Sequence, residues 1–242
     1  MTPVMFAFPN RILLGFFGLA FGSFISGLSY RYPRRLSNLK GRSFCDNCKK
    51  RISWYDNIPL FSFLLLGGKC RNCKKRISWR YPLIELSTAI GFSLIGFNIY
   101  SLLIFSLLEI IFIIDFEHKI IPDTFVFLGM FISIFNYQFS IYNSLLAGFI
   151  AAAFLLFIHL LTKGRGMGLG DVKFAVLGGV LVGLRFTGLW MLLAFLTGGI
   201  TGIILILMKR AGLKDQIAFG PFLVLAIPVT LICGEKIISV LL

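Results

Sequence analysis

Long runs of apolar residues, separated by short polar segments, dominate the chain. A run of about 17–25 apolar residues is long enough to cross a bilayer as a helix. Eight such runs, of which the sixth is short, cover approximately residues 11–29, 82–98, 101–116, 124–140, 144–162, 172–184, 186–208 and 217–242. The pattern predicts an all-α polytopic membrane protein with about eight transmembrane helices.

The composition agrees with a membrane protein and excludes a soluble globular domain, because 57% of the residues are hydrophobic and the mean hydropathy is +0.89. The first 30 residues have little positive charge at their start and no small-residue cleavage site before the basic loop that follows. We therefore interpret residues 1–30 as a retained first transmembrane helix and not as a removed signal peptide.

The positive charge is concentrated in one polar loop, residues 31–81, which contains 14 of the 24 Lys and Arg residues. If this loop is cytoplasmic, the alternation of eight helices places 21 of the 24 cationic side chains inside. Only Arg11, Arg185 and Lys236 then lie outside. This asymmetry follows the positive-inside rule and predicts that both termini are outside. Membrane orientation thus accounts for the net charge of +14, and we expect the lipid bilayer, not nucleic acid, as the partner of this surface.

The polar loop contains an internal repeat. The ten residues from Cys45 recur from Cys70 with nine identities, so that two C-x-x-C knuckles are separated by 21 residues. Their four thiolates suit a tetrahedral zinc ion, and the neighbouring lysines and arginines favour the thiolate form. Disulfides are the alternative, but they are rare in a cytoplasmic loop. The predicted ligands of a structural zinc in a small cytoplasmic zinc-ribbon-like domain are Cys45, Cys48, Cys70 and Cys73.

Two carboxylates stand out in the apolar part of the chain. Asp171 ends a glycine-rich run, residues 164–171, at the start of the sixth apolar run, and Asp115 lies at the cytoplasmic end of the third. A dinucleotide-binding loop would need a third glycine where Leu169 stands, and a glycine-rich turn capped by Asp171 is the simpler alternative. The topology, however, places both carboxylates at one membrane depth. Two carboxylates in a low-dielectric site can share one proton, as aspartic peptidases require.

Five other side chains have simpler or open explanations. Glu85 could favour the dipole at the start of the second helix or do more, and Glu109 has no partner that can be read from the sequence. Asp123 follows a proline and is expected to cap the fourth helix. His118 stands alone in a polar loop, which is typical of a solvated histidine. Cys233, in the last apolar run, is expected to be a packing residue.

With these motifs in view, the chain resembles the type IV prepilin peptidases, which are bifunctional leader peptidase and N-methyltransferase enzymes of bacterial inner membranes. The resemblance covers nearly the whole chain, and the combination of motifs is specific. A G-x-G-D segment alone would also fit presenilin-like intramembrane proteases. The motifs are the tetracysteine loop, W-Y-D-N-I-P at 54–59, R-Y-P at 80–82 with Glu85, the stretch from Asp115 to Asp123, and G-L-G-D at 168–171.

The resemblance implies a division into a first helix (1–30), a tetracysteine domain (31–81) and a membrane aspartic peptidase core (82–242). It implies that Asp115 and Asp171 are the catalytic aspartates and that Gly68 is associated with methyl transfer. The expected substrates are prepilins and pseudopilins with a short basic leader, cut at the cytoplasmic face of the inner membrane. The expected methyl donor for the new N-terminus is S-adenosylmethionine.

Two other functions fit part of the sequence. A transporter or channel with a zinc-stabilised cytoplasmic domain could use two carboxylates to pass protons or cations, but transporters often show paired halves with sites near the midplane. Here the clear repeat is the soluble knuckle, and both aspartates lie toward one face. A presenilin-like protease without methyl transfer is the second alternative.

Overall fold

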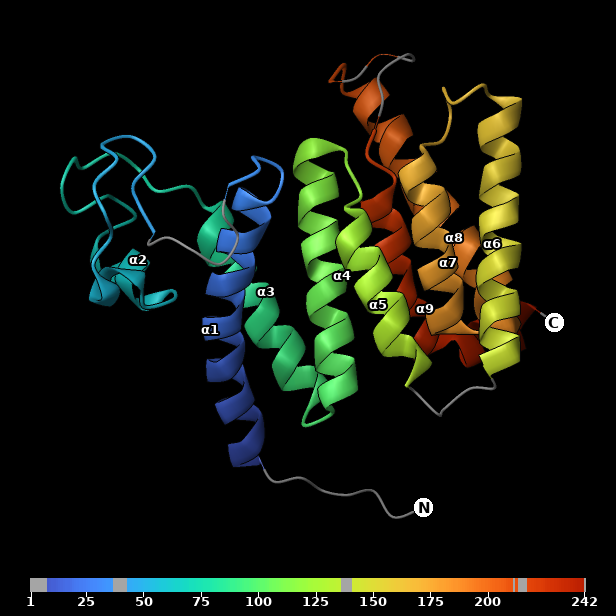
Figure 1. Cartoon of the computed structure of the whole chain (residues 1–242), viewed down its shortest axis with the longest axis horizontal. Coiled ribbons are helices and arrows are strands. Elements are labelled where there is room, and N and C mark those ends of the chain that lie inside the picture. The colour runs from blue at the N-terminus through green and yellow to red at the C-terminus, as the bar shows by residue number, and fades with distance from the viewer. Residues whose placement is uncertain (1–7, 37–42, 136–140, 211, 213–216, 242) are drawn as a thin grey trace. The chain divides into compact units, whose positions relative to one another are not determined.

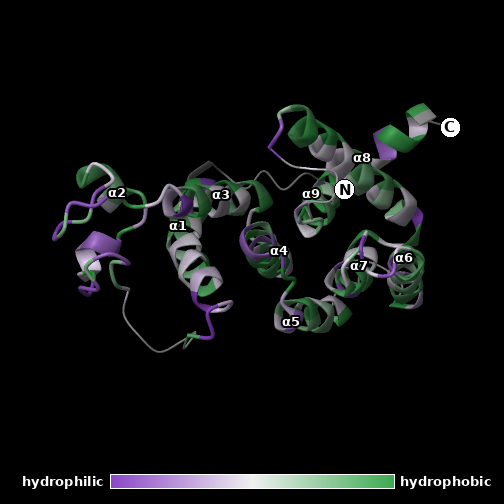
Figure 2. Cartoon of the chain, turned by 90° about the horizontal axis from the view of Figure 1, so that it is seen from above, coloured by the Kyte–Doolittle hydropathy of each residue, from purple (hydrophilic) through white to green (hydrophobic). Residues whose placement is uncertain are grey.

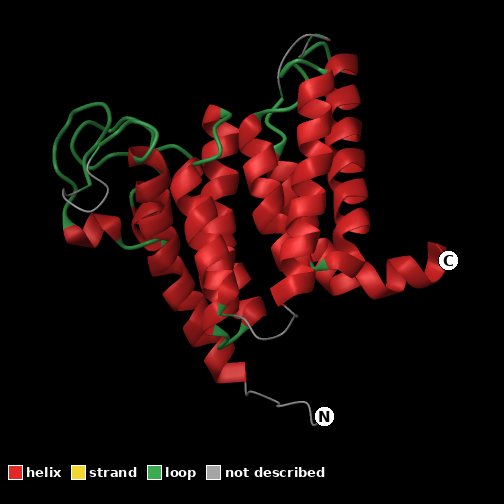
Figure 3. Ribbon diagram, turned by 45° about the vertical axis from the view of Figure 1, so that its right-hand side comes forward, coloured by secondary structure: helices red, strands yellow, loops and turns green. Residues whose placement is uncertain are grey.

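The structure is a computed structural model of the chain, and it describes residues 8–36, 43–135, 141–210, 212 and 217–241. The chain divides into two compact units, Met1–Ile110 and Ile111–Leu242. Within the described residues, β pairing is limited to two isolated bridges, Phe44–Arg51 and Lys69–Arg76. Figure 3 shows the remainder as helices joined by loops. The predicted all-helical fold is therefore confirmed.

Each of the eight apolar runs contains a helix, and two short helices lie in the polar loop (Figure 1). The apolar helices are α1 Phe8–Arg31, α3 Arg80–Ile95, α4 Ile99–His118, α5 Asp123–Ile134, α6 Ile141–Leu161, α7 Leu169–Val182, α8 Leu184–Leu207 and α9 Gly220–Leu241. The helices of the polar loop are η1 Trp54–Asn57 and α2 Phe61–Leu65. The fourth run was expected to reach residue 140, but α5 ends at Ile134, and residues 136–140 lie outside the described part.

Five of these helices are long and apolar enough to cross a membrane, namely Arg11–Arg31, Ile99–His118, Ile141–Leu161, Leu184–Leu207 and Gly220–Val240. Their outward faces carry many exposed large apolar side chains, including Phe16, Phe149 and Ile203. Figure 2 shows hydrophobic residues along much of the long helices, whereas hydrophilic residues gather mainly in the connecting segments. Because lipid covers such surfaces at no cost, the structure is that of a multi-pass membrane protein.

In the unit Met1–Ile110, α1 and α3 pack with their backbones in close contact. A Cβ atom on Gly18 would lie 2.7 Å from the Ala89 Cα, and one on Gly22 would lie 2.7 Å from the Glu85 Cα. Small residues permit such close approach between membrane helices. The guanidinium of Arg80, at the start of α3, also donates to the Ser26 carbonyl of α1 at 3.0 Å. The polar loop is thus anchored where it leaves and re-enters the helices.

In the unit Ile111–Leu242, glycine contacts fix α7. A Cβ atom on Gly179 would lie 2.7 Å from the Ala147 carbonyl oxygen of α6, so that these two helices also touch through their backbones. On another face of α7, Gly178 leaves room for the ring of Trp190 from α8. Trp190 is fully buried and its indole N–H donates to the Leu223 carbonyl of α9 at 2.9 Å. The helix that carries Asp171 is therefore held by α6, α8 and α9.

Candidate active site and metal centre

Asp115 lies in the last turn of α4 and its side chain is buried, with 4% of the residue exposed. The backbone N–H of Gly220, at the start of α9, donates to its carboxylate. A Cβ atom on Gly220 would lie 2.5 Å from the Asp115 Oδ2, so a larger residue would displace the carboxylate. Among the described residues, this oxygen is buried without a hydrogen-bond partner. It is therefore available to a water molecule or to a substrate.

Asp171 is the third residue of α7 and is also buried, with 9% exposed. Its Oδ2 accepts a hydrogen bond of 3.1 Å from the N–H of Gly168, the residue that precedes the helix. The predicted capping contact is thus present. It occupies one oxygen of the carboxylate and holds the side chain at the helix start, where the positive end of the dipole favours negative charge.

Ile121 lies close to both Gly170, which precedes Asp171, and Gly220, which contacts Asp115. A Cβ atom on Gly170, next to Asp171, would lie 3.2 Å from the Ile121 Cβ, and one on Gly220, next to Asp115, would lie 3.1 Å from its Cδ1. The two carboxylates are also close enough to interact electrostatically. Both predicted residues thus belong to one buried site within the unit Ile111–Leu242. Such a pair can hold one proton between two oxygens, with one group acting as acid and the other as base.

A second contact fixes this site and was not predicted. The Lys173 ammonium lies 2.7 Å from the Asp123 carboxylate, which joins the first turn of α7 to the first turn of α5. The expectation that Asp123 caps α5 is wrong. Pro122 occupies the capping position without a side-chain hydrogen bond, and Asp123 is the first helical residue. A lysine two residues after Asp171 was the available signal, but the sequence does not indicate which carboxylate it meets.

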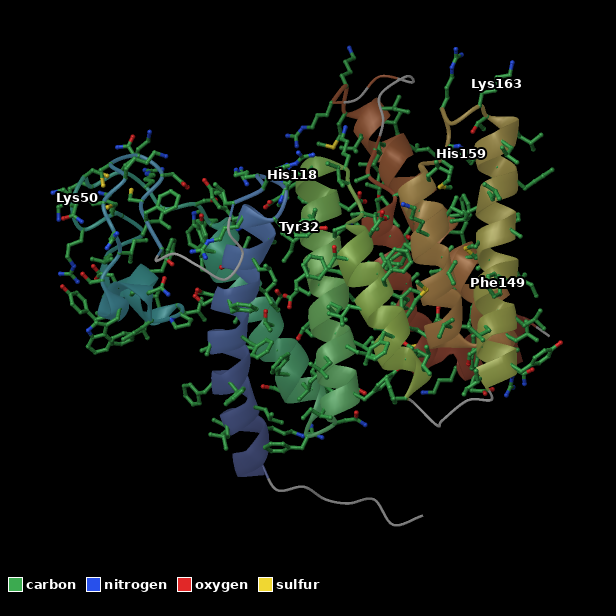
Figure 4. All side chains as sticks on the ribbon, viewed as in Figure 1. Tyr32, Lys50, His118, Phe149, His159 and Lys163 are labelled. Atoms are coloured by element: carbon green, nitrogen blue, oxygen red, sulfur yellow. The ribbon has the colours of Figure 1, made fainter. Side chains whose placement is uncertain are left out.

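The glycine-rich segment before α7 is held by α6. The His159 Nδ1 lies 2.7 Å from the Met167 carbonyl oxygen, and Gly164, which has a φ of 75°, turns against the same imidazole ring. Figure 4 shows His118, His159 and Lys163 at one end of this unit, with Phe149 farther along α6. Glycine is needed at position 164 because a positive φ strains other residues. The sequence did not suggest this role for His159.

The four cysteines of the knuckles gather into one cluster. Their sulfurs all lie within 4.8 Å of one another, and the Cys45 and Cys73 sulfurs are 3.8 Å apart. A tetrahedral zinc ion with Zn–S bonds of about 2.3 Å holds its sulfurs about 3.8 Å apart. Cys233 is not part of the cluster. The four side chains therefore fit a closed zinc site that leaves no position for water.

The two knuckles repeat their backbone hydrogen bonds 25 positions apart. The Cys45 N–H donates to the Lys50 carbonyl at 3.0 Å, and the Cys70 N–H to the Lys75 carbonyl at 2.9 Å. Lys49 and Lys74 have matching φ values of 56° and 58°. Each half therefore presents two sulfurs in the same way.

The thiols are also prepared for a cation. The backbone N–H of Lys75 and the Asn47 side chain donate to the Cys73 sulfur and lower the pKa of this thiol to about 6. The pKa of Cys48 instead rises to about 11, despite the N–H of Lys50, because desolvation and the neighbouring sulfurs disfavour a second thiolate. A bound divalent ion removes this conflict, since it stabilises all four thiolates together.

Gly68 has a defined structural role at the end of α2. Its N–H donates to the Phe63 carbonyl at 2.8 Å and the Gly67 N–H to the Leu64 carbonyl at 3.0 Å, which is the Schellman pattern of a helix end. Both glycines have positive φ values, 56° and 66°. A Cβ atom on Gly67 would meet nothing, whereas one on Gly68 would lie 3.1 Å from the Phe63 ring. A side chain at position 68 would therefore disturb the Phe63 ring, whereas one at position 67 would meet no neighbouring atom.

Glu85 of α3 and Glu109 of α4 both accept hydrogen bonds. The Glu85 carboxylate, 7% exposed, accepts a hydrogen bond of 2.8 Å from the Leu60 N–H, whose residue has a strained φ of 57°. Glu85 is the sixth residue of α3 and lies outside its first turn, so the dipole explanation is wrong; its carboxylate instead holds the turn that precedes α2. Glu109 accepts hydrogen bonds from the hydroxyls of Ser87 and Thr88, the latter at 2.9 Å. These hydroxyls are the partners that the sequence did not reveal.

Comparisons with known proteins match both units. Residues 16–99 match the bacterial peptidase A24 N-terminal domain, and residues 102–203 match the type IV leader peptidase family. Over 91% of this chain and 89% of the relative, the chain is 31% identical to the prepilin leader peptidase/N-methyltransferase of Pseudomonas aeruginosa. The chain belongs to the prepilin leader peptidase/N-methyltransferase family.

Further relatives support this assignment. The protein of the same name from Bacillus subtilis is 32% identical over 94% of this chain and 96% of the relative. The protein of the same name from Vibrio cholerae is 32% identical over 72% of this chain and 78% of the relative. No solved structure is significantly similar to the chain. The family makes the chain an enzyme, and its two matched regions contain the tetracysteine cluster and the aspartate pair, respectively.

Proposed function

We propose that the chain is a membrane aspartic endopeptidase that removes the leader peptide of prepilins and pseudopilins. The observation that carries the proposal is the buried pair of Asp115 and Asp171, both of which lie within the residues that match the type IV leader peptidase family. The names of the relatives supply the substrate class. The resemblance adds a basic leader that ends in glycine, usually followed by phenylalanine.

In the proposed reaction, the two carboxylates share one proton and bind a water molecule between them. The ionised carboxylate accepts a proton from the water, whose oxygen attacks the scissile carbonyl carbon. The protonated carboxylic acid donates its proton to the carbonyl oxygen. The carboxyl group that took the proton from the water then donates it to the leaving nitrogen, while the other carboxylate accepts a proton from a hydroxyl of the tetrahedral intermediate. The C–N bond breaks, and the pair again holds one proton. The unpartnered Asp115 Oδ2 supports this arrangement, since it is free to bind the water.

We further propose that the enzyme methylates the new N-terminus with S-adenosylmethionine and that zinc stabilises the tetracysteine domain through Cys45, Cys48, Cys70 and Cys73. The neutral α-amino nitrogen forms a bond to the methyl carbon of the donor. The carbon–sulfur bond breaks, its electron pair stays on sulfur, and the resulting methylammonium can lose a proton to water. The name N-methyltransferase and the fit of four sulfurs to a tetrahedral ion support these proposals.

The orientation is part of the proposal. Eight transmembrane helices with both termini outside would place the tetracysteine domain and the carboxylate pair at the cytoplasmic face of the bacterial inner membrane. The distribution of Lys and Arg supports this orientation.

The experiment is prepilin cleavage by purified protein in detergent, with zinc content as the folding control. Because Asn cannot exchange the proton, Asp115→Asn and Asp171→Asn should each lower the cleavage rate by about 10²–10⁴-fold, and the double variant should be hardly worse. Glu235→Gln, which changes an exposed carboxylate of α9, is the matched control. Near-wild-type cleavage by a zinc-loaded Asn variant would falsify the aspartic mechanism.

A further inference from the structure

A cavity of about 410 Å³ lies within the unit Met1–Ile110, between the knuckles and the adjoining ends of α1 and α3. Its volume is within the range of small-molecule sites, about 300–1,000 Å³. None of its lining residues belongs to the unit that holds the two aspartates. The lining includes Gly27, Tyr30, Asp46, Phe63, Tyr81 and Glu85.

The wall combines three kinds of group. Aromatic rings come from Tyr30, Phe63 and Tyr81, carboxylates from Asp46 and Glu85, and cations from the knuckles. A sulfonium-type methyl donor joins a flat aromatic base to a cationic sulfur and to an amino acid with both charges. Aromatic faces and carboxylates stabilise the base and the cationic groups, while lysines and arginines suit the carboxylate of the donor.

We propose that this cavity binds the methyl donor. The inference rests on the proposed methyl transfer and specifies where in the chain it takes place. Phe63 and Glu85 form part of the wall, and the α-amino group to be methylated must reach the same cavity. Lys50, which marks the tetracysteine loop in Figure 4, is part of the lining, so the zinc-binding knuckles shape the site from one side.

Gly68 acts on this cavity through Phe63. Gly68 is not itself a lining residue, but a Cβ atom there would lie 3.1, 3.5 and 3.7 Å from three atoms of the Phe63 ring. The shortest of these is tighter than an ordinary contact, so the ring must shift by a few tenths of an ångström, whereas the other two are ordinary contacts. Because Phe63 lines the cavity, a side chain at position 68 would change the shape of the site without touching the donor. Gly68 is thus a positioning residue, and this gives a physical reason for its association with methyl transfer.

Glu85 fixes the same wall through the turn that precedes α2. Its carboxylate accepts the Leu60 N–H at 2.8 Å and so holds the strained residue that begins the turn into α2. Strained backbone persists only where the surroundings over-determine it, and it is common at ligand sites. From this turn, α2 carries Phe63 into the wall. Glu85 and Gly68 therefore position Phe63 from the two ends of one short helix.

The first test fills the cavity. Gly27 lines it, and a Cβ atom there meets no atom within 4 Å, so Gly27→Leu places a side chain in open space without a clash. Binding of radiolabelled S-adenosylmethionine to the purified, zinc-loaded enzyme is measured directly. We expect the Kd to rise by about tenfold or more, since the side chain and the donor compete for one volume. Gly199→Leu, at a glycine of α8 that also meets nothing, is the matched control and should bind as wild type.

The second test uses the neighbouring glycines. Gly67→Ala and Gly68→Ala place the same methyl group at similar positive φ, but only the second meets Phe63. We expect Gly68→Ala to weaken donor binding by about tenfold and Gly67→Ala to change it by less than about twofold. Zinc content and thermal unfolding show whether each variant is folded. Equal effects of the two substitutions would reduce the role of Gly68 to helix termination and overturn its link to the cavity.

The outcomes separate this inference from the proposed function. If the wild-type enzyme methylates trimmed pilin while folded Gly27→Leu and Gly68→Ala bind the donor normally, the cavity assignment is wrong and methyl transfer stands. If the wild-type enzyme cuts prepilin but neither binds the donor nor transfers methyl groups, the cavity assignment and the proposed methyl transfer are both wrong. Photolabelling with tritiated donor gives a further readout. Label on peptides from residues 43–85 supports the cavity, and label confined to the unit Ile111–Leu242 overturns it.

Discussion

The ammonium group of Lys173 lies 2.7 Å from the carboxylate of Asp123, so that one ion pair joins the first turns of α7 and α5. Both side chains are about half exposed, with relative exposures of 48% and 49%. An exposed ion pair contributes at most about 1 kcal/mol to stability. Its position two residues after Asp171 suggests a larger effect on the orientation of that aspartate than on folding.

We therefore expect Asp123→Asn and Lys173→Gln each to lower prepilin cleavage by about tenfold, because small displacements of a reacting group are costly. The free energy of unfolding should change by less than about 1 kcal/mol. The double variant should be no worse than either single one, because the two residues form one interaction. Cleavage rates and thermal unfolding in detergent are the measurements.

The control for this pair is another ion pair in the same unit. Arg185 and Glu235 are also 2.7 Å apart and are more exposed than Lys173 and Asp123, and they join the start of α8 to α9. Arg185→Gln should leave cleavage unchanged. Additive losses in the Asp123→Asn/Lys173→Gln double variant would count against a shared positioning role.

Gly220 should be intolerant of any side chain. In Gly220→Ala the new methyl group would lie 2.5 Å from the Asp115 Oδ2, so the carboxylate must leave its present position in the site. We expect a cleavage loss of about tenfold or more with unchanged zinc content and donor binding. Gly188→Ala, in α8 and with no neighbour within 4 Å of the added atom, should be active. An active Gly220→Ala enzyme would show that Asp115 does not depend on this contact.

Zinc removal should separate the two activities. The wild-type protein should hold about one zinc per chain, measured by elemental analysis, since four thiolates close one site. Cys73→Ser should lower zinc content and destabilise the tetracysteine domain, because metal binding supplies much of the folding free energy of so small a domain. Methyl transfer should be lost, whereas part of the cleavage should survive in the other unit.

Cys233→Ser is the matched substitution, since this thiol lies outside the cluster, and it should retain zinc and both activities. A metal-free wild-type protein with intact knuckles, or a Cys73→Ser enzyme with normal zinc content, would contradict the four-thiolate site.

The orientation can be tested with single cysteines introduced into an otherwise cysteine-free chain. Arg165→Cys lies in the segment before α7, and Arg185→Cys lies at the start of α8. By the positive-inside rule, a thiol reagent that cannot cross the membrane should label position 185 but not position 165 in intact cells. Both positions should react in detergent. Labelling of position 165 alone in intact cells would reverse the proposed topology.

Local pattern alone was sufficient for much of the fold. Each apolar run contains a helix because a membrane segment must satisfy its own backbone hydrogen bonds, whatever surrounds it. The cluster of four cysteines could be predicted from the spacing of two knuckles, since each C-x-x-C forms its own turn. Alternation of helices also placed Asp115 and Asp171 at one end of the bundle. Helix formation and the cysteine turns depend on a few consecutive residues, and the common end of the two aspartates follows from the alternating direction of successive helices.

The tertiary structure decided which side chains meet between helices. Gly220 contacts Asp115 although 105 positions separate them, and Lys173 reaches across 50 positions to Asp123. The cavity beside Phe63 likewise requires α1, α3 and the knuckles together. Such contacts depend on the rotation and close approach of packed helices, which glycines at the interfaces permit and which hydrophobic periodicity does not specify, because lipid and protein favour the same apolar residues.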